Sequence, residues 1–140
     1  MALSILVVDD SQPMRAVIVK TIRAAGFGDA QFFEAANGRE AVEKLGENWV
    51  DIVVTDYNMP DMNGMDLLLL LKKDSVFSSI PVLMVTTEGS LERVDAFLRA
   101  GASGYIKKPF TPEKIREQLI SILGAPHGND AENCDEGLDF

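Results

Sequence analysis

Five polar side chains that could carry chemistry each follow a short apolar run of this sequence. They are Asp9, Asp10, Asp56, Thr86 and Lys108. Carboxylates that share one site repel one another unless a cation compensates, and carboxylate oxygens with water suit a hard divalent ion, here Mg²⁺. A carboxylate nucleophile, Mg²⁺, a fixed ammonium and a hydroxyl donor are what phosphoryl transfer to an aspartate requires. We therefore predict a site in which an oxygen of Asp56 attacks and Lys108 neutralises the phosphoryl oxygens.

Each of these residues alone also has an ordinary structural explanation. Paired aspartates after a strand often cap a helix, a lysine before a proline is usually an exposed loop residue, and a threonine at a strand end often begins a turn. The site interpretation depends on their coincidence, because the carboxyl ends of parallel strands meet at one edge of an open sheet.

The elements that must position these residues are short strands that alternate with longer amphipathic stretches. Three strands are apolar without alternation, which is typical of strands buried on both faces in a parallel sheet covered by helices. The second strand is more polar and suits a less central position. The predicted strands are Ser4–Val8, Gln31–Ala35, Val50–Asp56, Pro81–Thr86 and Gly104–Lys107.

Five helices are predicted from capping residues and from apolar spacing. The start signals are Ser11 with Pro13, Asn37 with Glu40, Asn63 with Gly64, and Thr111 with Pro112, and Gly124 ends the last helix. The predicted inward faces carry Met14, Val17, Ile18, Thr21, Ile22 and Ala25 in the first helix, Met65, Leu68, Leu69 and Leu71 in the third, Leu91, Val94, Leu98 and Gly101 in the fourth, and Ile115, Leu119 and Ile122 in the fifth.

This alternation predicts an α/β, doubly wound domain with a five-stranded parallel sheet over residues 1–123. If Asp9, Asp10 and Asp56 share one site, the first and third strands must be neighbours and the second must lie outside them. A strand order of 2-1-3-4-5 satisfies this with right-handed crossovers only. The expected fold is therefore flavodoxin-like with five helices.

The composition excludes several classes of protein. The chain has 140 residues and a formal net charge of -9, so it lacks the basic surplus that binding a nucleic acid backbone requires. Its apolar runs are too short for membrane insertion, and residues 1–20 do not resemble a signal peptide. The single cysteine, Cys134, favours a reducing cytoplasm as the location.

Residues 124–140 differ from the rest of the chain. They contain no Lys or Arg, and their acidic residues are Asp130, Glu132, Asp135, Glu136 and Asp139. We predict an acidic C-terminal tail that is extended or disordered. It is either an inert solvated segment or a docking peptide that uses Leu138 and Phe140.

Four motifs in this order and spacing resemble the receiver domain of bacterial two-component response regulators over residues 3–123. They are Val7-Val8-Asp9-Asp10-Ser11, Asp56-Tyr57-Asn58-Met59-Pro60 with Gly64, Val85-Thr86, and Lys107-Lys108-Pro109-Phe110. Within that family the segments Pro81–Thr86 and Gly101–Tyr105 are most similar to CheY-like chemotaxis receivers. Such receivers carry a tryptophan where this chain has Tyr57, and Trp49, which precedes the third strand, is expected far from the site.

The resemblance implies a role for each matching residue. Asp56 matches the phosphoacceptor, Asp10 and Asp56 match direct Mg²⁺ ligands, Asp9 matches a ligand acting through water, and Asn58 matches a ligand through its backbone carbonyl. Lys108 matches the lysine that contacts the phosphoryl group. Thr86 and Tyr105 match the switch pair, and Asn58 and Glu88 match the positions that tune dephosphorylation.

The resemblance also implies a function and a set of partners. The chain is expected to be a monomeric, single-domain response regulator that is phosphorylated by a sensor histidine kinase and assists its own phosphorylation and dephosphorylation, without being an enzyme. Its implied partners are a downstream protein such as a flagellar motor switch protein, and a phosphatase. The output face would be the last two helices and the strand between them.

Other interpretations stay open at this point. A receiver without its own output domain also serves as a phosphate sink or as a relay intermediate, or as an interaction module that needs no phosphate. A small aspartyl-phosphate phosphatase of the haloacid dehalogenase type would also place an aspartate after its first strand. That class requires an Asp-x-Asp motif, whereas Asp9 and Asp10 are adjacent here.

Overall fold

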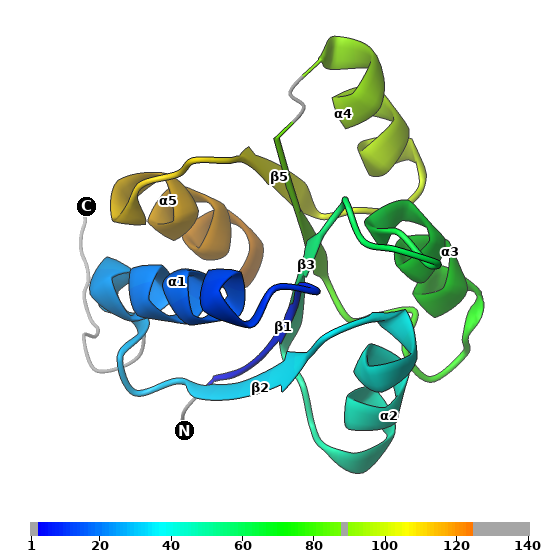
Figure 1. The fold of residues 1–140 in the computed structure, drawn as a ribbon, viewed down its shortest axis with the longest axis horizontal. Coiled ribbons are helices and arrows are strands. Elements are labelled where there is room, and N and C mark those ends of the chain that lie inside the picture. Colours follow the sequence, from blue (N-terminus) through cyan, green and yellow to red (C-terminus); the bar gives the residue numbers. More distant parts are fainter. Residues whose placement is uncertain (1–2, 88–89, 125–140) are drawn as a thin grey trace.

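The computed structural model describes residues 3–87 and 90–124. Within them, five parallel strands form one sheet in the order β2-β1-β3-β4-β5, and five α-helices flank it (Figure 1). The predicted fold class and strand order are therefore confirmed. In chain order the elements are β1 (Ser4–Val8), α1 (Gln12–Ile22), the π-helical turn η1 (Arg23–Phe27), β2 (Gln31–Ala35), α2 (Gly38–Glu47), β3 (Ile52–Asp56), α3 (Gly64–Lys73), β4 (Val82–Thr86), α4 (Leu91–Arg99), β5 (Gly104–Lys107) and α5 (Pro112–Leu123).

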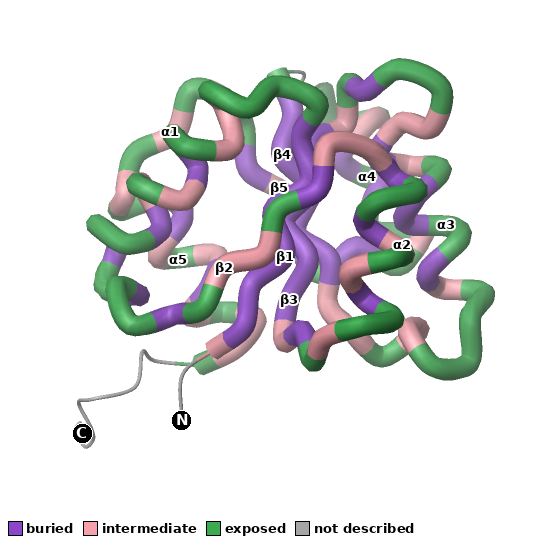
Figure 2. Tube along the Cα trace, turned by 60° about the horizontal axis from the view of Figure 1, so that its bottom comes forward, coloured by how far each residue is buried: buried purple, intermediate pink, exposed green. Residues whose placement is uncertain are grey.

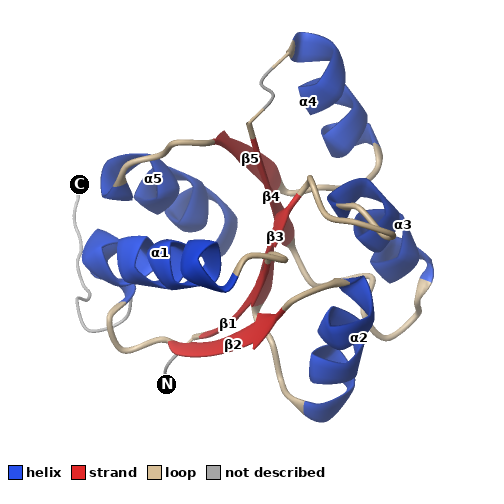
Figure 3. Ribbon diagram, in the orientation of Figure 1, coloured by secondary structure: helices blue, strands red, loops and turns tan. Residues whose placement is uncertain are grey.

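Helices cover both faces of the sheet (Figure 3). α1 and α5 lie on one face, where their buried residues are Ile18, Ile22, Ile115 and Leu119. α2, α3 and α4 lie on the other face, where their buried residues are Ala41, Leu45, Leu67, Leu68, Leu71 and Phe97. Because successive strand residues point to opposite faces, Ile5 and Val7 belong to the first core and Leu6 and Val8 to the second.

The burial of each strand follows its place in the sheet (Figure 2). All five residues of β1, β3 and β4 are buried, whereas β2 at the edge is largely exposed or half-buried. A strand covered on both faces is typically a near-continuous apolar run. The unbroken apolar runs and the more polar second strand therefore marked the central and the edge positions correctly.

The predicted helix starts are confirmed by side-chain hydrogen bonds. Each capping oxygen accepts from the backbone N–H three residues later, and the caps are Ser11, Asn37, Asn63 and Thr111. Asn63 and Asp66 form a reciprocal capping box at the start of α3. At the other end of the chain, Gly124 ends α5 with a φ of 95°, a backbone region that favours glycine.

The buried face of α4 differs from the prediction. Leu91 and Leu98 are 86% and 47% exposed, whereas Phe97 is fully buried. Val94 and Phe97 define the inward face, and Gly101 lies beyond the end of the helix. With about 100° of turn per residue, Leu91 and Leu98 share one flank roughly 70–90° from the centre of that face. An apolar flank of α4 is therefore open to solvent.

Two smaller corrections concern α3 and α1. In α3, Leu67 is fully buried and Leu69 is 42% exposed, because a run of five leucines has no period from which a face could be predicted. In α1, Val17 is 53% exposed, although Ile18 and Ile22 are buried as predicted.

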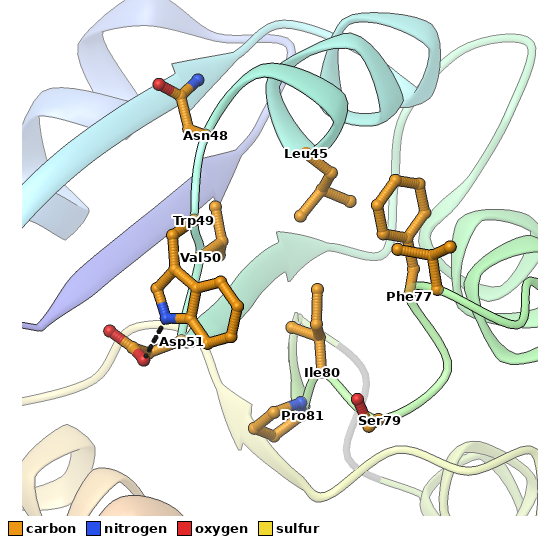
Figure 4. A pocket seen from close by; sticks show the side chains of 10 residues that line it. Leu45, Asn48, Trp49, Val50, Asp51, Phe77, Ser79, Ile80 and Pro81 are labelled. Carbon is orange, nitrogen blue, oxygen red and sulfur yellow. Dashed lines mark hydrogen bonds between the residues drawn. The ribbon is translucent and has the colours of Figure 1, made fainter.

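Two strands begin later than predicted, at Ile52 rather than Val50 and at Val82 rather than Pro81. Before β3, the Asp51 carboxylate turns to accept the Ser4 backbone N–H at 2.8 Å, so Asp51 joins β1 and β3 through its side chain. Its other oxygen accepts from the indole N–H of Trp49, which lines a pocket at this amino-terminal edge of the sheet (Figure 4). Trp49 is thus at the edge opposite to Asp56, as predicted.

None of the described helices is long and apolar enough to cross a membrane. Glu88, one of the two positions implied to tune dephosphorylation, lies outside the described residues. So does the predicted acidic tail after Gly124, and the boundary between domain and tail stays a prediction.

Replacing Gly64 with alanine should destabilise the fold by about 1–3 kcal/mol, the range typical of overpacking. An added Cβ would lie 2.6 Å from the Asp56 carbonyl oxygen and 2.7 Å from Met84 Sδ, at the start of α3. Denaturant unfolding measures the change. The control is Gly46→Ala in α2, where nothing lies within 4 Å of the new Cβ, and stability should rise by about 0.4–1 kcal/mol. Equal stability of Gly64→Ala and the unsubstituted protein would contradict the close approach of α3 to the Asp56 loop.

Candidate functional site

The three carboxylates predicted to share a site converge at the carboxyl edge of the sheet. Asp9, Asp10 and Asp56 each place a carboxylate oxygen within 4.8 Å of the others. This follows from the pairing of β1 with β3, because Val8 lies beside Thr55 and the residues after them emerge side by side. Asp9 is 1% exposed and Asp56 4% exposed, whereas Asp10 is open to solvent. The cluster therefore combines two buried carboxylates with one exposed carboxylate.

Lys108 reaches this cluster from the loop after β5. Its Nζ lies 3.0 Å from Asp56 Oδ1 and 3.4 Å from Asp9 Oδ2. Its backbone N–H donates to the carbonyl oxygen of Thr86 at 2.7 Å, so the loop is tied to the end of β4. The structure thus brings the predicted lysine into contact with the predicted acids, although Lys108 and Asp9 are 99 residues apart in the sequence.

The pKa of the Asp56 carboxyl is raised above its ordinary value of 3.8, chiefly because burial disfavours the charged form. The Lys108 ammonium and the backbone N–H of Asn58 lower the pKa, and the charge of Asp9 raises it. Burial outweighs the single ammonium, so ionised Asp56 is held in a site that only partly compensates its charge.

One buried oxygen of Asp56 has an ion pair but no well-formed hydrogen bond. Within the described part of the chain, Asp56 Oδ1 lies 3.0 Å from Lys108 Nζ, and no donor meets it in good hydrogen-bond geometry. A buried acceptor without a hydrogen bond is destabilising unless another group satisfies it. Three carboxylates facing one ammonium leave negative charge in excess, so this donor set fits a hard divalent cation such as Mg²⁺. The exposure of Asp10 leaves one side of the cluster open for water ligands.

Arg15 in α1 is a site residue that sequence reasoning missed. Its Nη1 donates to the Asp9 carbonyl oxygen at 2.6 Å, and its Nε donates to Glu34 Oε1 at 2.9 Å. The sequence carried only a weak signal. Arg15 is a cation at the start of a helix whose first turn has no acidic residue, a position that the helix dipole disfavours slightly. That signal does not identify the partners, which the structure shows to be the Asp9 carbonyl and Glu34.

Thr86 and Tyr105 lie on the face of the sheet that α4 covers. Thr86 ends β4 and is fully buried. Tyr105 in β5 pairs with Met84 in register and packs, half-buried, against the core cluster that contains Met84 and Phe97. Thr86 follows Met84 by two residues, so its side chain points to the same face as Tyr105. The two residues of the predicted switch pair therefore share one face, near the carboxyl edge.

Tyr57, which follows Asp56, connects the site to α4. Its ring lies 5.3 Å from the ring of Phe97, and the Arg93 guanidinium stands 4.6 Å from the Tyr57 ring centroid. Cation–π contacts of this kind are weak but directional. The residue that follows Asp56 is thus in contact with two residues of α4.

Comparison with known proteins gives a consistent result. The model of the response regulator receiver domain matches residues 5–120. Chemotaxis protein CheY1 of Helicobacter pylori is 46% identical over 123 residues, which cover 87% of this chain and 98% of that protein. The CheY homologue of Campylobacter jejuni is 41% identical over 130 residues, which cover 92% and 98%. The crystal structure of Vibrio cholerae chemotaxis protein CheY4 superposes with a TM-score of 0.79 at 34% identity, covering 88% of this chain and 100% of that chain.

Replacing Asp56 with asparagine should raise the melting temperature at pH 7 without divalent ions. Since its pKa is higher in the folded protein than in the unfolded chain, the folded form binds more protons between the two values. The contribution of Asp56 to stability therefore falls as the pH rises through that window and stays unfavourable above it. Each kcal/mol gained in the free energy of unfolding should raise the melting temperature of a domain of this size by roughly 3–5 °C, as measured in a thermal scan.

The advantage of Asp56→Asn should shrink as the pH falls through the folded-state pKa of Asp56, where the native carboxyl becomes neutral. Asp29→Asn, an exposed change before β2, is the control and should leave the melting temperature unchanged. A lower melting temperature for Asp56→Asn, or a difference that does not depend on pH, would show that Asp56 is not destabilised by burial.

Proposed function

Because the chain belongs to the response regulator receiver family, we propose that it is a signalling switch that accepts a phosphoryl group on Asp56 from a sensor histidine kinase. The observation that carries this proposal is the ion pair between Lys108 Nζ and the buried Asp56 Oδ1, 3.0 Å apart, beside two further carboxylates. An ordinary surface ion pair would not combine burial with a surplus of acids. The proposed location is the cytoplasm.

The transfer moves a phosphoryl group from an imidazole nitrogen of a kinase phosphohistidine to a carboxylate oxygen of Asp56. The P–N bond breaks as the P–O bond forms, and the imidazole nitrogen takes a proton from solvent. The raised pKa of Asp56 makes its ionised form costly, and the Lys108 ammonium offsets part of that cost and keeps the nucleophile charged. After transfer, the same ammonium faces the phosphoryl oxygens, which carry more negative charge than the carboxylate did.

Asp9, Asp10 and Asp56 are the residues that would hold Mg²⁺, with the backbone carbonyl of Asn58 as a further proposed ligand. When bound, the ion supplies positive charge that the equatorial oxygens of the phosphoryl group need. Asp10 is the exposed member of the cluster and so faces the side from which a phosphodonor approaches. Asp9 is buried, and its Oδ1 already accepts the Ser11 N–H at 2.8 Å. This favours a contact between Asp9 and the ion through a water molecule rather than a direct one.

The proposed switch uses Thr86 and Tyr105. A phosphoryl group on Asp56 offers new acceptor oxygens at the carboxyl edge, and the Thr86 hydroxyl is a donor at the end of the adjacent strand. Movement of Thr86 toward the phosphoryl group would open space on the face that it shares with Tyr105, and the half-buried Tyr105 ring would turn into that space. The coupling free energy between two such sites, here Asp56 and the output face, is typically about 1–3 kcal/mol.

The output surface is proposed to be the face formed by α4, β5 and α5. The exposed flank of α4 carries Leu91 and Leu98, and a groove between β5 and α5 is lined by Tyr105, three lysines and one acid, which are Lys107, Lys108, Lys114 and Glu117. A patch that joins apolar side chains to lysines suits a peptide with apolar and acidic residues. Since the relatives named above are chemotaxis proteins, we propose that this chain acts in chemotaxis. Its proposed target is the flagellar motor switch protein expected from the family resemblance.

Incubation with acetyl phosphate and Mg²⁺ should add one phosphoryl group, and Asp56→Asn should abolish the addition. Removal of Mg²⁺ with a chelator should have the same effect, because the excess negative charge would then repel the donor. Intact-mass spectrometry measures the product. Asp29→Asn is the matched control and should be labelled as the unsubstituted protein is. Equal labelling of Asp56→Asn and the control would refute the assignment of the phosphoacceptor.

Lys108→Ala should retain Mg²⁺ binding but lose the coupling between phosphorylation and the output face. Mg²⁺ binding persists because the ligands are oxygens, whereas the contact between the ammonium and the phosphoryl group is removed. Hydrogen exchange of α4 and β5, compared with and without beryllofluoride as a phosphoryl mimic, measures the coupling. Lys20→Ala, an exposed change on α1, should keep the full response. A full response in Lys108→Ala would mean that the lysine is not part of the switch.

A further inference from the structure

The contacts of Asp9 and Asp10 with the rest of the chain are unequal. Asp9 is held on every side: its N–H donates to the Ala35 carbonyl at 3.1 Å, its carboxylate accepts the Ser11 N–H, and its other carboxylate oxygen faces Lys108. Asp10 is exposed, and among the described residues no hydrogen bond or ion pair holds its carboxylate. No side-chain contact therefore fixes the Asp10 carboxylate, and the backbone sets the direction in which the Asp10 side chain leaves the chain.

We infer that Arg15, held by Glu34, is a positioning residue for the metal site: it orients the peptide that joins Asp9 to Asp10 and so aims the Asp10 carboxylate. This inference rests on the proposed function, because it concerns the same Mg²⁺ ligands. Arg15 Nη1 donates to the Asp9 carbonyl oxygen, which belongs to that peptide, at 2.6 Å. A rotation of the peptide plane would move the Asp10 side chain and the carbonyl oxygen together.

Glu34 fixes the guanidinium that makes this contact. Arg15 Nε and Glu34 Oε1 are 2.9 Å apart, and the Arg15 side chain is only 14% exposed. The Glu34 side chain is 46% exposed, so the pair is buried on the Arg15 side only, and its value lies in geometry: the planar guanidinium presents both donors in a fixed relation. Because Glu34 belongs to β2 and Arg15 to α1, the pair connects the edge strand and the first helix to the metal ligands.

Charge and position make opposite predictions for Arg15, which gives the inference a sharp test. A guanidinium near a cation site opposes cation binding, so if only its charge mattered, Arg15→Met should bind Mg²⁺ more tightly. If Arg15 positions Asp10, the same variant should bind Mg²⁺ more weakly. Loss of a residue that orients a metal ligand typically weakens affinity about 10- to 100-fold, and we expect roughly 10-fold here.

Isothermal titration calorimetry with Mg²⁺ alone, on the full chain, measures this affinity. The matched control is Arg116→Met, because Arg116 also donates to a backbone carbonyl, that of Ala25, at 2.6 Å but away from the acids. Arg116→Met should lower the melting temperature and leave the Mg²⁺ affinity unchanged. Arg15→Met should weaken Mg²⁺ binding whatever its melting temperature.

Two further variants separate position from stability. Glu34→Gln keeps Arg15 but weakens its anchor, so it should reduce Mg²⁺ affinity less than Arg15→Met does. The double variant should bind Mg²⁺ about as weakly as Arg15→Met alone, because both changes act through the same contact. Arg15→Lys keeps the charge but cannot contact Asp9 and Glu34 in the same planar arrangement, and it should also bind more weakly. Unchanged or tighter Mg²⁺ binding by Arg15→Met, beside normal binding by the unsubstituted protein, would overturn the inference alone. Absence of Mg²⁺ binding in the unsubstituted protein would overturn the proposed function with it.

Discussion

A buried carboxylate that faces a single ammonium, with two more carboxylates beside it, is the interaction on which this molecule depends. Burial raises the pKa of Asp56, and Lys108 compensates only in part. Such a site is unfavourable for the stability of the fold, and the surrounding elements have to maintain it. The apolar strands β1, β3 and β4 supply that support, because their complete burial fixes the places where Asp9 and Asp56 leave the sheet. The incompletely compensated charge of Asp56 lowers the stability of the fold, and the same charge makes this carboxylate available to a cation and to a phosphoryl group.

The sheet and much of the site could be predicted because strong, local signals agreed with one another. Unbroken apolar runs marked buried strands, and the need to bring Asp9 and Asp56 together required β1 and β3 to be neighbours. Lys108 could be included because parallel strands end at one edge, even though its partners lie far away in the sequence. The site residues were thus predicted from topology and from residue type together, and their roles in phosphorylation stay predictions.

The remaining errors have physical causes. The leucines of α3 form a continuous run, so no period distinguished buried Leu67 from exposed Leu69. In α4, Phe97 takes the inward position and leaves Leu91 and Leu98 on an exposed flank, which depends on tertiary packing rather than on spacing. Arg15 was missed because its partner on the site is a backbone carbonyl, and no residue type reports the direction of a carbonyl group. Surfaces and positioning contacts are therefore where structure adds most to the sequence.

The identity of the reacting carboxyl is tested most directly by trapping the acyl phosphate. The protein would be treated with acetyl phosphate and Mg²⁺, reduced with borohydride to convert the phosphorylated aspartate to homoserine, digested, and mapped by mass spectrometry. The proposed chemistry predicts homoserine at position 56, with Asp9 and Asp10 unchanged. Homoserine at another aspartate, or a phosphoryl group carried by His127 instead, would contradict it.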